Sequence, residues 1–115
     1  MSSESTTSER APRTTHRAED AAEHLDVLGN QCSRTILYAT QDGPKTAKEL
    51  TDRTDCSSAT VYRRINDLLE NDLVEECIRF ERGGSHTTAY RSLVEGLDVR
   101  FDQDGIRVEI VEQPS

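Results

Sequence analysis

The side chains with the most specific chemistry lie together on one predicted helix, residues 57–71. With about 100° per residue and Ile65 at the centre of the buried face, this helix turns arginine, threonine and asparagine outward. Arginine can bind guanine O6 and N7 through two hydrogen bonds, asparagine can do the same for adenine, and threonine offers a methyl group to thymine. The side chains expected to contact DNA are Ser58, Thr60, Tyr62, Arg63, Arg64 and Asn66.

Two of these side chains are assigned to phosphate groups. Ser58 lies at the N-terminus of the helix, where free N–H groups and the helix dipole favour an anion. Tyr62 lies at the boundary of the buried face, so its ring can pack on the core while its hydroxyl reaches a phosphate. By itself, an exposed Thr-x-x-Arg-Arg-x-Asn sequence is also typical of an ordinary solvated helix surface.

The segments on either side of this helix favour the DNA interpretation. Before it, Thr46 and Glu49 form a T-x-x-E capping box that opens a short helix. After it, residues 73–80 and 87–93 predict two strands of a hairpin. Helix, turn, helix and hairpin in this order predict a winged helix-turn-helix, whose second helix enters a DNA groove.

The loop of the predicted hairpin, or wing, carries two further candidates, Arg82 and His86, on either side of Gly83 and Gly84. Glycines allow close approach, and an arginine at such a tip can enter a narrow minor groove. The alternative is a plain hairpin turn with one solvated arginine. His86 is the weaker candidate, because a neutral histidine gains little from the phosphate field.

The remaining elements complete an α+β fold, a winged helix-turn-helix built from a helix bundle with a β-hairpin wing, plus a C-terminal β-hairpin. Residues 18–28 predict a helix that Gly29 ends, and Asn30 can cap a second helix. Residues 97–101 and 106–110 alternate apolar and charged side chains around an Asp-Gln-Asp-Gly turn. An isolated hairpin is barely stable in water, so its apolar face must cover this domain's core, a second subunit or a ligand.

Composition divides the 115 residues into a tail and one small domain. All 23 isoleucine, leucine, valine and phenylalanine residues lie between Leu25 and Val111, whereas eight of the first 20 residues are serine or threonine. We expect a disordered Ser/Thr-rich arm over residues 1–17, the DNA-binding domain over residues 18–93, and the C-terminal hairpin and tail over residues 94–115. Because so small a core is marginal, we expect burial against a second copy in a homodimer.

Charge and cysteine content bear on the cellular environment. The absence of a long apolar run and of a secretory signal excludes a membrane span and export, and three scattered cysteines fit a cytoplasmic protein. The formal net charge is −8, and 12 of the 14 basic residues are arginine. Acidic excess with scarce lysine resembles proteins of extreme halophiles, although an ordinary acidic protein is the alternative. In molar salt, DNA binding by such a chain should depend weakly on salt concentration.

Cys32 is the candidate for a redox-responsive thiol. It follows the helix cap Asn30 and precedes Arg34, and helix N-termini and cations lower a thiol pKa. The alternative is a small core residue, which we also expect for Cys56, while Cys77 is uninformative. No motif of an enzyme, a metal site, a cofactor or a small-molecule ligand is present.

The chain resembles small winged helix-turn-helix transcription regulators of the ArsR-like superfamily, in the form common among halophilic archaea. The resemblance is carried by residues 28–30, 32–37, 47–50, 57–69 and 73–74, and the wing with Tyr90 and Arg91 extends it to about residue 93. It implies a homodimer that binds double-stranded DNA and represses or activates promoters. Residues 49–54 lack the paired cysteines of metal-sensing members, which argues against metal sensing there. The alternative function is a winged helix that acts as a protein–protein interaction module without DNA binding.

Overall fold

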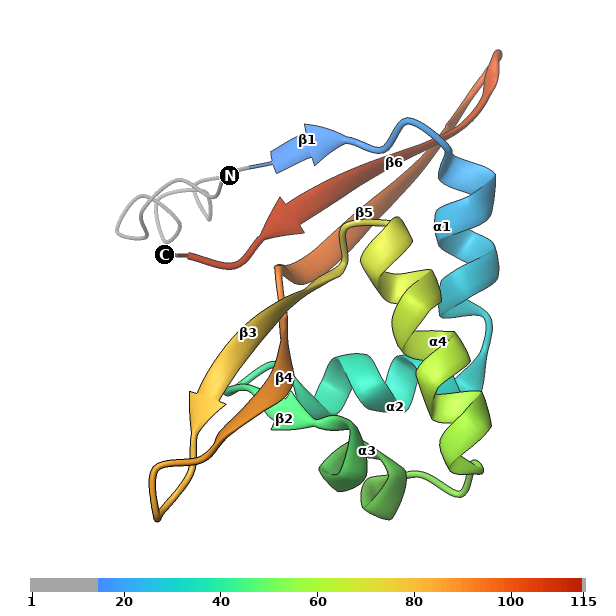
Figure 1. Ribbon diagram of the computed structural model, residues 1–115. Helices are drawn as coiled ribbons and strands as arrows, with labels where there is room; N and C mark the ends of the chain where they lie inside the picture. The colour runs from blue at the N-terminus through green and yellow to red at the C-terminus, as the bar shows by residue number, and fades with distance from the viewer. Residues whose placement is uncertain (1–14, 115) are drawn as a thin grey trace, which may run out of the picture.

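The computed structural model describes residues 15–114, which form an α+β fold with a helix-turn-helix (Figure 1). The helices are α1 (Ala21–Leu28), α2 (Gln31–Ala39), α3 (Ala47–Arg53) and α4 (Ser58–Glu70). The strands are β1 (Thr15–Arg17), β2 (Lys45–Thr46), β3 (Val74–Phe80), β4 (His86–Ser92), β5 (Val94–Asp102) and β6 (Gly105–Glu112). The predicted fold class is confirmed: β3 and β4 form the wing hairpin, and β5 and β6 form the C-terminal hairpin.

Side-chain caps open the helices where the sequence predicts them. Asn30 accepts a hydrogen bond from the Ser33 amide at the start of α2, and Ser57 accepts one from Thr60 at the start of α4. Both halves of the capping box between Thr46 and Glu49 are present. Local sequence therefore sets the starting points of the three helices that build the helix-turn-helix.

The first helix is shorter than predicted. It begins at Ala21 rather than at Ala18, because Asp20 caps it by accepting a hydrogen bond from the Glu23 amide at 3.0 Å. Residues 15–17, which we assigned to the arm, form strand β1 on β6. Three residues carry no strand pattern of their own, so the available edge of β6 decides their conformation. Residues 1–14 lie outside the described part of the chain.

Two small antiparallel sheets flank the helices. One has the order β2–β4–β3 and contains the wing, and the other, which we call the C-terminal sheet, has the order β1–β6–β5. Asp72 adopts φ 57° directly after α4, so the chain reverses and enters β3, as the Asn-Asp pair predicts. Strand β2 was not predicted, because two residues are too short to show alternation.

The helices and both sheets share one hydrophobic core. Ile36, Leu50 and Ile65 are almost fully buried at the helix contacts, and Val108 and Ile110 of β6 join the same cluster. The inner part of the C-terminal hairpin therefore covers this domain's own core, one of the three expected possibilities. Among residues 15–114, no helix is long and apolar enough to cross a membrane.

His24 shows how the tertiary structure uses a residue that the sequence places near the tail. Its ring is buried between α1 and the end of α4. Nδ1 lies 3.0 Å from the carbonyl oxygen of Asp20, and Nε2 lies 3.1 Å from that of Asn71. The imidazole thus joins the first helix to the point where α4 ends.

Candidate nucleic-acid interface

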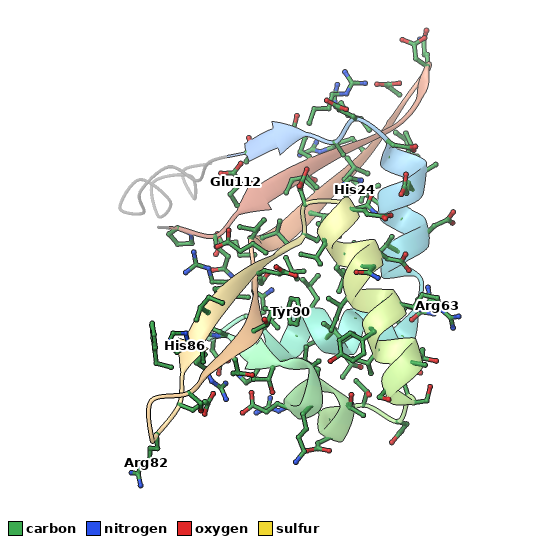
Figure 2. All side chains as sticks on the ribbon, in the orientation of Figure 1. His24, Arg63, Arg82, His86, Tyr90 and Glu112 are labelled. Atoms are coloured by element: carbon green, nitrogen blue, oxygen red, sulfur yellow. The ribbon has the colours of Figure 1, made fainter. Side chains whose placement is uncertain are left out.

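Helix α4 presents one open face, which we call the outer face and define as Ala59, Tyr62, Arg63 and Asn66. All four are exposed, while Val61, Ile65 and Leu68 bury the opposite side of the helix. Figure 2 shows the Arg63 side chain directed away from the helices that pack on α4. Within residues 15–114, Arg63 makes neither an ion pair nor a side-chain hydrogen bond, so its guanidinium is available to a ligand.

Arg64 and Thr60 are less exposed than predicted. Arg64 is half buried and forms an ion pair with Asp67 at 2.8 Å, three residues along the helix. Thr60 is half buried, and its hydroxyl accepts a hydrogen bond from the Ser57 hydroxyl at 3.0 Å. The buried side of α4 is centred among Val61, Ile65 and Leu68 rather than at Ile65. Thr60 and Arg64 therefore lie at the edge of the buried side. The same ion pair neutralises Asp67, whose charge would otherwise oppose a phosphate.

A groove separates the outer face from the wing, which comprises β3, β4 and residues 81–85. Tyr62 lies on its helical side, Lys48 of α3 borders it, and His86, Thr88 and Tyr90 line its strand side. The pKa of Tyr90 is raised, first by burial and then by the nearby Glu76 and Tyr62. Lys48 is exposed, and it could not be predicted from the sequence because a single lysine on a short helix has no distinctive pattern.

An ion-pair cluster fixes the wing against α3. Arg79 donates two parallel hydrogen bonds to Glu49, at 2.8 and 2.9 Å, and also pairs with Glu81 at 3.0 Å. The hydrogen bonds from Arg79, followed by that from the Thr46 amide, lower the pKa of Glu49 to about 2. Glu49 therefore serves both the capping box and the wing, and Arg79 is a positioning residue that the sequence did not reveal.

The charges along the groove nearly cancel. Its basic side chains are Lys48 and Arg79, and its acidic side chains are Glu49, Asp52 and Glu81. Since Arg79 pairs with both glutamates, Lys48 and Asp52 remain as opposite charges that form no ion pair within the described part of the chain. This groove is not a basic channel, so binding there would depend on shape and hydrogen bonds more than on long-range attraction.

The wing tip carries Arg82 as predicted. Gly83 and Gly84 both have φ 89°, a conformation that favours glycine, and they shape the turn. Arg82 is exposed at the tip and points away from the body (Figure 2). His86 lies at the start of β4, where its ring packs edge-on against Phe80 with centroids 4.6 Å apart. This contact gives His86 a structural role beside Phe80.

The surroundings of Cys32 favour the core alternative over a redox-responsive thiol. Cys32 is buried, and burial, a side-chain hydrogen bond with Cys56 and the charge of Cys56 raise its pKa to about 11, although Arg64 acts in the opposite direction. The Arg34 guanidinium does not help, because it donates to the Leu28 carbonyl oxygen at 2.9 Å. Cys56 packs against the core as expected. The core alternative for Cys32 is the one that fits.

The comparisons with known proteins agree with this architecture. Residues 34–77, which run from α2 through α4 into β3, match the helix-turn-helix domain family. No curated protein and no solved structure matches the chain. The match supports a helix-turn-helix assignment at a level broader than the ArsR-like resemblance. Sequence match and fold together identify residues 34–77 as similar to the helix-turn-helix domains of DNA-binding regulators.

Proposed function

We propose that this chain is a sequence-specific DNA-binding transcription regulator that acts as a homodimer in the cytoplasm. The outer face of α4 would enter the major groove, and the wing would contact the backbone or the minor groove. The observation that carries the proposal is the position of Arg63, which is exposed and unpaired among residues 15–114 and lies beside Asn66 on the second helix of a helix-turn-helix match. These two side-chain types are the ones that bind guanine and adenine through paired hydrogen bonds.

The arrangement of the elements supports this role. The N-terminus of α4, helix α3 and the wing tip lie at the same end of the molecule, and the C-terminal sheet lies at the other (Figure 1). A duplex could therefore meet α4 and the wing together. We assign Arg63 and Asn66 to bases, Tyr62, Ser58 and Lys48 to phosphates, and Arg82 to the minor groove.

Thr60, Arg64 and His86 receive smaller roles in this proposal. Each already has an intramolecular contact, with Ser57, Asp67 and Phe80 respectively. We also leave a thiol switch out of the function, because a buried thiol with a raised pKa holds little of the reactive thiolate at neutral pH.

The acidic surface fits a cell with high internal salt. A chain of net charge −8 gains little long-range attraction to DNA. At molar salt the Debye length is about 3 Å, so repulsion between the acidic surface and phosphate is largely screened. Recognition would then rest on contacts made at the outer face, as the balanced charge of the groove suggests.

The decisive experiment selects duplexes from a random pool in molar KCl and sequences those that bind. We expect wild type to enrich one motif, Asn66→Ala to relax a single position of that motif, and Arg63→Ala to lose most of the enrichment. Arg91→Ala is the matched control, since it removes one positive charge from β4 beside Glu75, away from the groove. If no duplex is enriched, or if Arg63→Ala and Arg91→Ala behave alike, the protein–protein module becomes the better explanation.

A further inference from the structure

Strand β5 has a hydrogen-bonded neighbour on one side only within residues 15–114. It pairs with β6 and forms the edge of the C-terminal sheet. Every residue from Asp98 to Asp102 is exposed, and the exposed fraction reaches 81% at Phe101. An open edge strand with apolar side chains is a template for pairing with another strand.

The hairpin register decides which backbone groups face the open side. Two residues connect the strands, and Asp102 lies opposite Gly105. This closing pair and every second pair along the ladder exchange hydrogen bonds. Leu97, Val99 and Phe101 occupy the intervening positions and turn their N–H and C=O groups outward. In the described part of the chain, none of the three makes a backbone hydrogen bond outside the sheet.

We propose that two copies of this chain form the homodimer by antiparallel pairing of their β5 strands about a two-fold axis at Val99. In this register Val99 faces the partner's Val99, and Leu97 faces the partner's Phe101. The three outward residues of each copy then close six N–H···O bonds. The exposed Phe101 side chain then lies beside the partner's Leu97, which packs against the core of its own chain.

The charges on the other face of the hairpin favour the same register. Within one chain, Asp98 lies opposite Glu109 and Arg100 lies opposite Arg107, and such like-charge pairs are unfavourable. The exposed ion pair between Asp98 and Arg100, at 3.3 Å, offsets part of this repulsion.

A second β5 strand supplies the missing opposite charges. Pairing about Val99 places the partner's Arg100 opposite Asp98 and the partner's Asp98 opposite Arg100. These fall at the non-hydrogen-bonded positions, where opposing side chains approach most closely. By symmetry, one register therefore forms two ion pairs together with the six backbone bonds.

The wing strand β3 is also a sheet edge, but two of its three charged residues, Glu75 and Arg79, are already paired within the chain. Arg79 binds Glu49 and Glu81, and Glu75 binds Arg91. Pairing through β5 also leaves the proposed DNA surface free, because the C-terminal hairpin projects from the opposite end of the molecule (Figure 1). Each copy would use the same patch, as a two-fold interface requires.

The first test measures the mass in solution by sedimentation and light scattering, over a wide range of protein concentration. We expect wild type at twice the chain mass of 12.9 kDa. Val99→Pro removes an outward N–H group and leaves the bonds to β6 intact, so it should give a folded monomer. Val99→Ala keeps the N–H group and should remain a dimer. A monomeric wild type, or a Val99→Pro variant that still dimerises, overturns the proposal.

A charge-swap series provides an independent test if Val99→Pro fails to fold. Asp98→Arg and Arg100→Asp each replace both interchain ion pairs by repulsion, so each should weaken the dimer about tenfold at low salt. The double variant Asp98→Arg/Arg100→Asp restores opposite charges and should recover the wild-type dissociation constant. An equimolar mixture of the two single variants should form mixed dimers. A double variant as weak as the single variants refutes the register.

This inference specifies the homodimer of the proposed function but does not depend on DNA binding. The selection experiment performed on Val99→Pro separates the two ideas. A dimer that Val99→Pro disrupts, in a protein that enriches no duplex, would refute DNA binding alone. If the Val99→Pro variant remains a dimer and still enriches a motif, the β5 interface alone would be refuted.

Discussion

The two adjacent arginines of α4 should have separate roles. Arg63 is exposed and unpaired among the described residues, whereas Arg64 is half buried and bound to Asp67. Replacing each by alanine changes the net charge equally, so a difference in outcome reports on position. The comparison therefore tests whether the outer face of α4, rather than its charge, recognises DNA.

The expected magnitudes follow from these surroundings. Arg63→Ala removes no ion pair or side-chain hydrogen bond among residues 15–114, so the free energy of unfolding should change by less than about 0.5 kcal/mol. If Arg63 grips a base in two-point fashion, the loss is about 1–3 kcal/mol, which corresponds to roughly a 5- to 150-fold lower affinity per half-site. Arg64→Ala breaks a partly exposed ion pair, so it should cost about 0.5–1 kcal/mol of stability. Its effect on DNA affinity should be several times smaller.

The assays are fluorescence anisotropy with the selected duplex and urea denaturation of the free protein, both in molar KCl. Asp67→Ala provides a control, because it should reproduce the stability loss of Arg64→Ala without lowering DNA affinity. A larger affinity loss for Arg64→Ala than for Arg63→Ala, with stability unchanged, would refute the assignment of the outer face.

Further outcomes are expected for Glu49, for Cys32 and for the salt dependence of DNA binding. Glu49→Gln preserves the capping box but loses the charge that binds Arg79, so it should lower the free energy of unfolding by about 0.5 kcal/mol. Glu49→Ala also loses the cap and should lower it by about 1–2 kcal/mol. Urea denaturation at pH 7 measures both changes. The pKa of Glu49 in the folded protein is about 2, below the ordinary 4.5, so this stabilisation is present above pH 4.5 and is lost as the pH falls toward 2. The stability of Glu49→Gln should lack this loss between pH 4.5 and 2. Cys32, with a pKa of about 11, should react with iodoacetamide about 100-fold more slowly than an ordinary thiol at pH 8, as followed by mass spectrometry; rapid labelling of Cys32 in the folded protein would contradict its buried environment. Specific DNA affinity should change little between dilute and molar KCl, and a steep decline would show that phosphate charge dominates binding.

Local signals in the sequence predict most of the secondary structure. Asn30, the Thr46–Glu49 pair and Ser57 open helices where their capping chemistry indicates, because a cap involves residues only three apart. The alternating side chains of residues 97–101 and 106–110 predict β5 and β6, and the Gly-containing loop between residues 73–80 and 87–93 predicts the hairpin of β3 and β4. The order of these elements is enough to predict the helix-turn-helix and its wing.

Side-chain partners distant in sequence could not be predicted in this way. Arg79 meets Glu49 across 30 residues, and His24 meets Asn71 across 47. The state of Cys32 also depends on its neighbour: helix position and Arg34 predicted a lowered pKa, but burial beside Cys56 raises it. Such effects depend on distance and desolvation, which spacing along the chain does not determine.

The sequence by itself determined the element order, the helix caps and the arginine-bearing helix, because each arises from contacts within a few residues. Among the residues that the structure describes, the tertiary structure alone decided that Arg63 is free while Arg64 is paired. It also decided that β5 ends its sheet there, with outward-facing Leu97, Val99 and Phe101. A side chain or backbone group can bind a partner only if internal packing and hydrogen bonding have left it free, and this is decided in the folded chain.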